Sequence, residues 1–307
     1  MPAAIPACQV IFRCLRHFGT LSAASADPQR LSRTTTPEFL CSGLGSVEGY
    51  MDDSRDGKTF RIPYSRRLSW DLLWFNQSVP LCGHDRYCNL SALAAARKAA
   101  DVRISWPAIF LKAYALVAQE VPELRQTWHR WPWAHLYQHP SSVGTLTVQR
   151  EVKGERWLFW GTVVEPEAMS LIDIQRMVDH FTTGSPRDLF GREQKLARLP
   201  TILRRMIWGW NLHVAHRKRA TRLGTFFLST LAGRGVEIQV PPSIHTGCLT
   251  YGPIDECGKL KVTLAYDHRV LDGALIAEVL ARLEATLSEA LRLELLQLRG
   301  SASPVGG

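Results

Sequence analysis

Apolar and polar positions follow two regular patterns along most of the chain after residue 60. Apolar residues that recur every three or four positions predict helices, and strict alternation predicts strands. The strongest helical pattern spans residues 104–124, and Pro122 is expected to end it. The apolar face of this helix is predicted to contain Ile109, Phe110, Ala113, Leu116 and Val117.

The remaining segments alternate between the two patterns. A short strand followed by a helix is expected in 61–80, and Ser91 is a candidate N-cap for the next helix. Further helices are expected in 90–102, 170–181, 199–222 and 274–295. Strands are expected in 143–152, 156–164, 224–231, 247–255 and 259–266, the first two joined as a hairpin by 153–155. Strands interleaved with helices predict an α/β domain with a mixed sheet.

The two ends of the chain lack this periodicity. We expect disordered tails in residues 1–55 and 301–307, flanking one domain in 56–300. The first 25 residues contain Arg13 and Arg16 but no acid, a composition that resembles an organellar transit peptide. A disordered extension, or a start codon assigned too far upstream, is the favoured interpretation. A cytoplasmic protein is therefore expected, with an organelle matrix as the alternative.

Positive charge is concentrated in one part of the chain. The net charge is +9, and no acid occurs between Glu193 and Glu237. That interval holds Lys195, Arg198, Arg204, Arg205, Arg217, Lys218, Arg219, Arg222 and Arg234. Such a block favours anionic partners, although a solvated basic surface is an equally good interpretation. No nucleic-acid-binding motif accompanies it, so no nucleic-acid partner is expected.

Membrane and metal chemistry are less well supported by the sequence. No stretch reaches the ~18 apolar residues that span a bilayer, so a soluble or at most peripheral protein is expected. The apolar stripe in 201–214 is flanked by arginines, but we expect a buried amphipathic helix there rather than membrane contact. Seven irregularly spaced cysteines predict free thiols in a reducing compartment. Neither the Cys82–Cys88 run nor His129, His135 and His139 has the spacing of a zinc site, so no metal is expected.

The turn "YDHRVLDG", Tyr266 to Gly273, carries the densest chemistry. His268 leaves the end of a predicted strand, and Asp272 stands immediately before the closing helix. A neutral imidazole held on a rigid element could act as a general base. Alternatively, Asp272 is only an N-cap and His268 a turn residue. Spacing alone favours this second interpretation.

Three stretches together resemble a known family. "DHRVLDG" after "VTLAY" is similar to the active-site signature of the dihydrolipoyl acyltransferase core of 2-oxoacid dehydrogenase complexes, whose fold chloramphenicol acetyltransferase shares. "WPAIFLKAYALVAQEVPELRQTW" resembles the family's helix that ends in a Pro-Glu-Leu turn. "GTFFLSTLAG" resembles the strand whose serine stands 39 residues before His268. The resemblance covers about residues 60–292 and implies a chloramphenicol acetyltransferase-like two-layer α/β sandwich with a mixed sheet and flanking helices.

The resemblance also implies roles for individual residues. His268 matches the general base, and Ser229 matches the serine that stabilises the oxyanion, with Thr230 as the alternative. Asp272 matches a structural aspartate that pairs with an arginine near the start of the domain, here Arg66 or Arg67. Asp267, Arg269 and Gly273 would support the loop.

Substrates and partners follow from the same resemblance. A coenzyme A thioester is the expected co-substrate, an acyl-carrier thioester is the alternative donor, and no permanently bound cofactor is expected. The family works as trimers, with the histidine of one subunit meeting the serine of its neighbour. No lipoyl-domain motif is present, which favours a free-standing acyltransferase with an unknown acceptor. The alternative is a non-catalytic trimeric scaffold or binding protein that retains the fold.

Overall fold

The computed structural model of the chain describes residues 58–299. The expected tails, residues 1–55 and 301–307, lie outside the described residues, as do residues 56, 57 and 300 at the expected domain boundaries.

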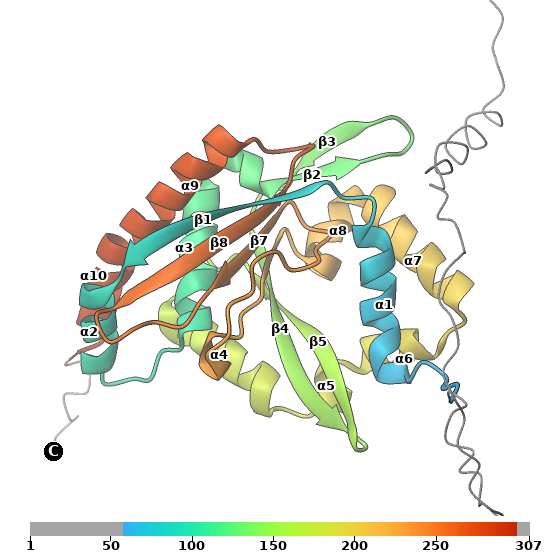
Figure 1. Cartoon of the computed structure of the whole chain (residues 1–307), viewed down its shortest axis with the longest axis horizontal. Helices are drawn as coiled ribbons and strands as arrows, with labels where there is room; N and C mark the ends of the chain where they lie inside the picture. The colour runs from blue at the N-terminus through green and yellow to red at the C-terminus, as the bar shows by residue number, and fades with distance from the viewer. Residues whose placement is uncertain (1–57, 300–307) are drawn as a thin grey trace, which may run out of the picture. The chain divides into compact units, whose positions relative to one another are not determined.

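A six-stranded sheet in the order β1-β8-β7-β6-β4-β5 organises the domain (Figure 1). The strands are β1 (Leu81–Asn89), β4 (Val143–Val152), β5 (Glu155–Val164), β6 (Phe226–Leu228), β7 (Gly247–Tyr251) and β8 (Lys259–Asp267). β6 runs parallel to both of its neighbours, whereas the other pairs are antiparallel. The predicted mixed sheet is confirmed. A separate hairpin pairs β2 (Gln126–His129) with β3 (His135–Gln138).

The β4–β5 hairpin has the turn that its sequence predicts. Lys153 and Gly154 have φ values of 54° and 77°, so both lie in the left-handed region. A two-residue hairpin loop of this kind has the twist that matches two right-handed strands. β5 begins at Glu155, which makes the connection one residue shorter than expected.

The helices lie on both faces of the sheet. They are α1 (Tyr64–Asn76), α2 (Ser91–Ala99), α3 (Trp106–Glu120), α4 (Leu171–Thr183), α5 (Pro186–Leu189), α6 (Gly191–Arg198), α7 (Thr201–His213), α8 (His216–Leu223), α9 (Gly273–Thr286) and α10 (Arg292–Gln297). A 3-10 turn covers Pro122–Arg125, and a π-helical turn covers Leu287–Leu291. None of the helices among residues 58–299 is long and apolar enough to cross a bilayer.

The main core lies between one face of the sheet and α3, α4 and α9. α3 is buried on nearly every side, and even Lys112 is only 9% exposed. Its ammonium group is satisfied by Glu294, at 2.6 Å, in α10. The predicted apolar face of this helix is therefore correct, but the buried part of the helix extends well beyond it.

The opposite face of β4 and β5 is covered by α1, α7 and α8. Trp160 of β5 packs edge-on against Trp208 of α7, with ring centroids 6.1 Å apart. Phe159, one residue earlier, is fully buried in the main core. Both faces of β5 are thus packed at this point, which explains the run of apolar residues at 157–160.

β8 differs from its expected half-buried pattern. Leu260, Val262, Leu264 and Tyr266 do share the core face, as predicted. The other face is also buried, because the segment before β7 crosses it: Thr250 donates a hydrogen bond to the carbonyl of Ile238. Lys261 on that face pairs with Glu237 at 2.6 Å.

Several local expectations need correction. Residues 61–63 form no strand, and Ser91 is the first residue of α2 rather than its N-cap. Asn89 instead accepts a hydrogen bond from the Ser91 amide. The expected single helix over 199–222 is broken at Val214–Ala215, and the strand expected in 224–231 is only three residues long. β1 and the β2–β3 hairpin were not predicted.

Candidate active site

His268 stands one residue beyond the end of β8. Its backbone amide donates to the carbonyl of Pro80 at 3.0 Å, and the preceding Asp267 amide donates to Thr246. The side chain is exposed, and its ring centroid lies 5.5 Å from that of the buried Tyr266. The imidazole makes no hydrogen bond to any other described residue. A rigid backbone thus presents an imidazole with both nitrogens unpaired.

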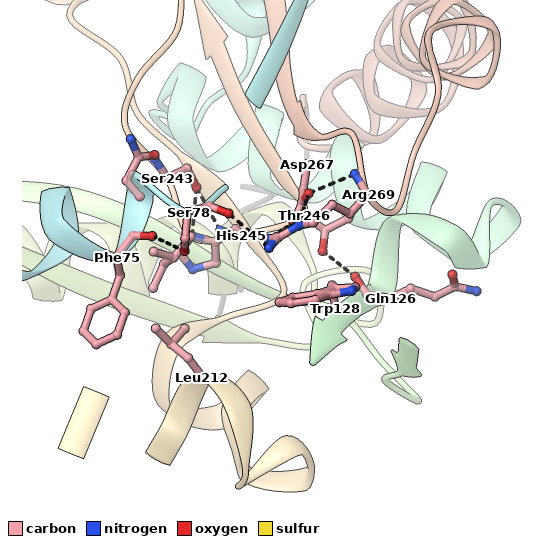
Figure 2. A network of polar contacts seen from close by, with 12 residues as sticks. Phe75, Ser78, Gln126, Trp128, Leu212, Ser243, His245, Thr246, Asp267 and Arg269 are labelled. Carbon is pink, nitrogen blue, oxygen red and sulfur yellow. Dashed lines mark hydrogen bonds and ion pairs between the residues drawn. The ribbon is translucent and has the colours of Figure 1, made fainter. Parts of the chain in front are cut away.

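Asp267 and Arg269, the residues before and after this histidine in the chain, are joined by hydrogen bonds (Figure 2). The Asp267 carboxylate is buried and accepts from the Arg269 amide at 3.0 Å and from its guanidinium at 2.5–3.1 Å. The guanidinium also donates to the carbonyl of Ser78 and lies 4.1 Å from the ring centroid of Trp128. The backbone amides of Asp267 and His268 both donate to carbonyls, and Asp267 pairs with Arg269. These contacts leave the backbone of His268 little freedom.

Asp272 is the N-cap of α9. Its carboxylate accepts a hydrogen bond from the Leu275 amide at 2.9 Å. Gly273 opens the helix, and a Cβ at this position would lie 3.3 Å from Nε2 of His84. Close approach of the β1 side chain therefore favours glycine here.

The expected ion pair between Asp272 and Arg66 or Arg67 does not form. Arg67 donates to the carbonyls of Ile62 and Ala197 and lies over the Tyr64 ring at 4.2 Å, while the Arg66 side chain is exposed. Both arginines are in the first turn of α1, whose other end leads into β1. Nine helical residues at 1.5 Å each place them about 13 Å from that end. They are too far from the turn to pair with Asp272.

Ser229 and Thr230 follow β6, and their hydroxyl groups differ. Thr230 Oγ1 donates to the carbonyl of Tyr251 at 3.1 Å and accepts from the Ala232 amide at 3.0 Å. The Ser229 amide bonds to Leu249, but its hydroxyl makes no hydrogen bond within residues 58–299. Ser229 is half-buried. Of the two candidates, Ser229 alone has a hydroxyl proton available for a ligand.

Within one chain His268 and Ser229 lie at opposite ends of the sheet. The register aligns Leu228 with Leu249 and Leu249 with Leu264. His268 is four residues beyond Leu264, and Ser229 is one residue beyond Leu228 in the opposite direction. Five steps of about 3.3 Å separate them by roughly 16 Å along the strands alone. The two side chains cannot touch the same carbonyl carbon in one subunit.

A cavity of about 690 Å³ opens at Thr230, the residue that follows Ser229 in the chain. Thr230 and Tyr251 line it, together with the cations Arg97, Arg103 and Arg234. The Arg97 guanidinium lies 4.9 Å from the ring centroid of Trp106. Burial, and then the neighbouring charge of Arg103, lowers the pKa of Arg97. An anion in this cavity would relieve that repulsion.

Arg219 is a residue of this region that the sequence analysis grouped in the basic block between Glu193 and Glu237. It is buried beside the Asp267–Arg269 pair and donates to the carbonyls of Trp128, Leu212 and Ile244. Burial lowers its pKa to about 10, with Asp267 acting in the opposite direction. Its role is to tie three chain segments together under the turn. The sequence signal for Arg219 was its place in a stretch without acidic residues. That signal is typical of an exposed basic region, whereas Arg219 is buried.

The remaining candidates from the sequence are the histidines and cysteines considered as metal ligands. No group of three or more His, Cys, Asp or Glu within residues 58–299 is placed to hold a metal ion. Cys82, Cys88, Cys248 and Cys257 are free thiols. His129 and His139 share the Thr127 hydroxyl, at 2.9 and 3.2 Å, inside the β2–β3 hairpin.

The sequence matches no protein-family model and no curated protein. Its structure is similar to a probable dihydrolipoamide acetyltransferase from Listeria monocytogenes (15% identity, 82% of this chain and 100% of that one, TM-score 0.54). The dihydrolipoamide acetyltransferase of Azotobacter vinelandii aligns at 18% identity over 80% and 97%, with a TM-score of 0.55. A truncated catalytic core of the 2-oxoacid dehydrogenase complex from Thermoplasma acidophilum aligns at 14% over 76% and 99%, with a TM-score of 0.56. This chain therefore has the fold of the acyltransferase cores of 2-oxoacid dehydrogenase complexes.

Proposed function

We propose that this protein is an acyltransferase that moves an acyl group from a thioester, coenzyme A being the expected carrier, directly to an acceptor nucleophile. The observation that carries the proposal is the turn after β8. In a chain with the acyltransferase fold, this turn presents the exposed, unpaired imidazole of His268. The Asp267–Arg269 pair fixes the backbone of the turn.

His268 is the general base in this proposal. An imidazole nitrogen accepts the proton of the acceptor nucleophile as that nucleophile attacks the thioester carbonyl. The tetrahedral intermediate then expels the thiolate, and the proton held by the imidazole can neutralise it. No acyl-enzyme forms, because the acceptor attacks the donor directly.

Ser229 stabilises the negative charge on the carbonyl oxygen in the intermediate. A fixed donor aimed at such an oxyanion commonly contributes about 3 kcal/mol to catalysis. Its hydroxyl is free for this task, whereas that of Thr230 is committed to the backbone. In the Azotobacter protein, a serine, a histidine and an asparagine four positions after the histidine were studied for their catalytic roles. The corresponding fourth position here is Asp272, which caps α9.

The cavity that Thr230 lines suits the phosphate-bearing part of the donor. Its three arginines present guanidinium groups, which bind phosphate oxygens in a fixed, often bidentate geometry. Arg103 also pairs with Asp179 at 3.8 Å, and both side chains of this pair are largely exposed.

The separation of His268 and Ser229 favours a site shared between subunits. We propose a homotrimer in which His268 of one subunit faces Ser229 of the next. One of the similar structures is the cubic core of a pyruvate dehydrogenase complex, a multisubunit assembly.

Thiol release from a panel of acyl-coenzyme A donors, with and without candidate amine, alcohol and thiol acceptors, tests the function. Wild type should release thiol with at least one pair, and His268→Ala should lose at least 100-fold in kcat. His180→Ala, an exposed histidine on α4, is the matched control and should keep the wild-type rate. Equal rates for His268→Ala and wild type, or no turnover of any donor, would leave the non-catalytic scaffold as the better account.

A further inference from the structure

A surface on the opposite side of the domain from α10 exposes many large apolar side chains. We call it the tryptophan face and define it by Trp131 and Trp133 at the tip of the β2–β3 hairpin and by Ile202, Met206 and Trp210 on α7. The tryptophans are 62%, 72% and 60% exposed, and Ile202 is 78% exposed. Figure 1 shows the hairpin, α7 and α8 at the right of the domain and α10 at the left.

The parts of this face are continuous. One hollow is lined by Trp131 and Trp133 together with Val214 and His216, which joins the hairpin tip to the α7–α8 junction. Val214 and His216 also line a second hollow with Trp210 and the start of α8. Arg205 of α7 connects the face to α1. Its guanidinium lies 4.9 and 4.4 Å from the ring centroids of Trp70 and Trp74.

α7 is apolar on the side that the fold does not use. Its buried residues are Arg204, Trp208 and Leu212, which face the domain. Ile202, Met206 and Trp210 repeat every four residues on the opposite side and remain exposed. A surface helix ordinarily carries charged or polar residues there. Folding of residues 58–299 therefore does not account for this second stripe.

Unpaired positive charges border the apolar residues. Arg217, Lys218 and Arg222 on α8 and Arg130 beside the hairpin tip are exposed. None of the four makes an ion pair with another described residue. No acidic residue occurs from position 194 to 236, so nothing in this stretch offsets the charge.

We propose that the tryptophan face docks the protein on the surface of a lipid bilayer that contains anionic headgroups. Tryptophan is favoured at membrane–water interfaces, where its ring enters the apolar layer and its N–H stays hydrated. Basic side chains beside such rings are attracted to anionic lipids. An anionic bilayer meets both requirements at once, and the hairpin tip and α7 supply two separate points of insertion. This inference does not depend on the proposed function.

The test is co-sedimentation of the full chain with two kinds of vesicle. One contains phosphatidylcholine alone, and the other also contains about 30 mol% of the anionic lipid phosphatidylglycerol. Binding is expected to the anionic vesicles and to fall with added salt. Each Lys or Arg near the surface contributes roughly fivefold in affinity. Arg217→Glu with Lys218→Glu should therefore weaken binding at least tenfold, and Trp131→Ser with Trp133→Ser should do the same.

Matched controls lie on the far side of the domain. Leu293→Ser removes an exposed apolar residue of α10, and Lys98→Glu reverses an exposed charge of α2. Both should bind like wild type, and all variants should keep the wild-type circular dichroism spectrum. Absence of binding to either vesicle, or equal losses in the control variants, overturns the proposal. So does a change in oligomeric state caused by the tryptophan variants, because the face would then be a subunit interface.

Discussion

At the scale of single residues, the neighbours Ser229 and Thr230 show how hydrogen bonding selects a candidate. Both hydroxyl groups follow β6, but Thr230 already donates to Tyr251 and accepts from Ala232. Diverting that proton to a ligand would leave the carbonyl of the buried Tyr251 without its donor. The Ser229 hydroxyl makes no hydrogen bond within residues 58–299, so its proton can be donated to a ligand without breaking one.

Removing the two hydroxyl groups should therefore have different effects. Ser229→Ala should lower kcat by about 10²–10³-fold with little change in the free energy of unfolding. Thr230→Val should instead lower the free energy of unfolding by about 1 kcal/mol and leave kcat within a few-fold of wild type. Steady-state kinetics and urea unfolding on both variants check this. The opposite pattern would make Thr230 the oxyanion donor.

Buried histidines make the stability of the protein depend on pH. His245 Nε2 donates to the carbonyl of Leu223 at 2.6 Å, so its Nδ1 accepts from the Ser243 hydroxyl. Burial lowers the pKa of His245 to about 4, that of His139 to about 4 and that of His129 to about 3. Between about pH 4 and 6.5 the unfolded chain thus holds more protons on these groups, and the free energy of unfolding falls as pH falls.

Glu193 acts in the opposite direction, because burial raises its pKa to about 7. Three histidines outweigh one carboxyl, so going from pH 7 to pH 5 should cost on the order of 3 kcal/mol. Urea unfolding at the two pH values measures this, and His245→Gln should reduce the difference. Equal free energies of unfolding at pH 5 and pH 7 would contradict the assignment of neutral, buried imidazoles.

At the scale of elements, α1 and α7 are joined by a buried ion pair. Arg204 donates to both carboxylate oxygens of Asp71, at 2.6 and 3.2 Å, and both side chains are almost completely buried. Arg205 adds a longer contact to the same carboxylate at 3.4 Å. Packing of α7, and with it the tryptophan face, depends on this pair.

Removing one partner leaves an uncompensated buried charge. Asp71→Asn should lower the free energy of unfolding by about 3–5 kcal/mol. The control is Glu120→Gln, which breaks the exposed pair with Arg282 and should lower the free energy of unfolding by less than about 1 kcal/mol. Urea unfolding compares them. The double variant Asp71→Leu with Arg204→Met should recover most of the loss. A loss for Asp71→Asn no larger than for Glu120→Gln would show that the pair is not desolvated.

What the sequence could predict at this scale depended on local signals. The core face of β8, α3 and the β4–β5 hairpin follow from periodicity and turn residues within each segment. β1 was not predicted, because "LCGHDRYCN" lacks an alternating pattern and becomes a strand by pairing with β8. Arg204 and Arg219 were grouped in the basic block, because the carboxylate partner of Arg204 lies 133 residues away and Arg219 bonds to backbone carbonyls, which leave no mark in the sequence. The Asp272 pairing failed because the length of α1 separates the arginines from the turn.

At the scale of the whole molecule, the sheet itself limits how the candidate site can work. The sequence supplied His268 and Ser229 through a family resemblance, but their separation of roughly 16 Å along the strands follows only from the register. One subunit cannot place both groups on one carbonyl. Catalysis by this pair therefore requires an assembly in which each site draws on two chains.

Subunit mixing tests this central claim most directly. His268→Ala and Ser229→Ala, each nearly inactive alone, should be unfolded together, refolded as mixed oligomers and assayed for thiol release from an acyl-coenzyme A. A mixed oligomer contains interfaces where an intact His268 meets an intact Ser229, so a substantial fraction of wild-type activity should return. Refolded wild type gives the upper limit, and each variant refolded alone gives the background. Activity of the mixture no higher than that background, in oligomers shown to contain both variants, would contradict a site shared between subunits.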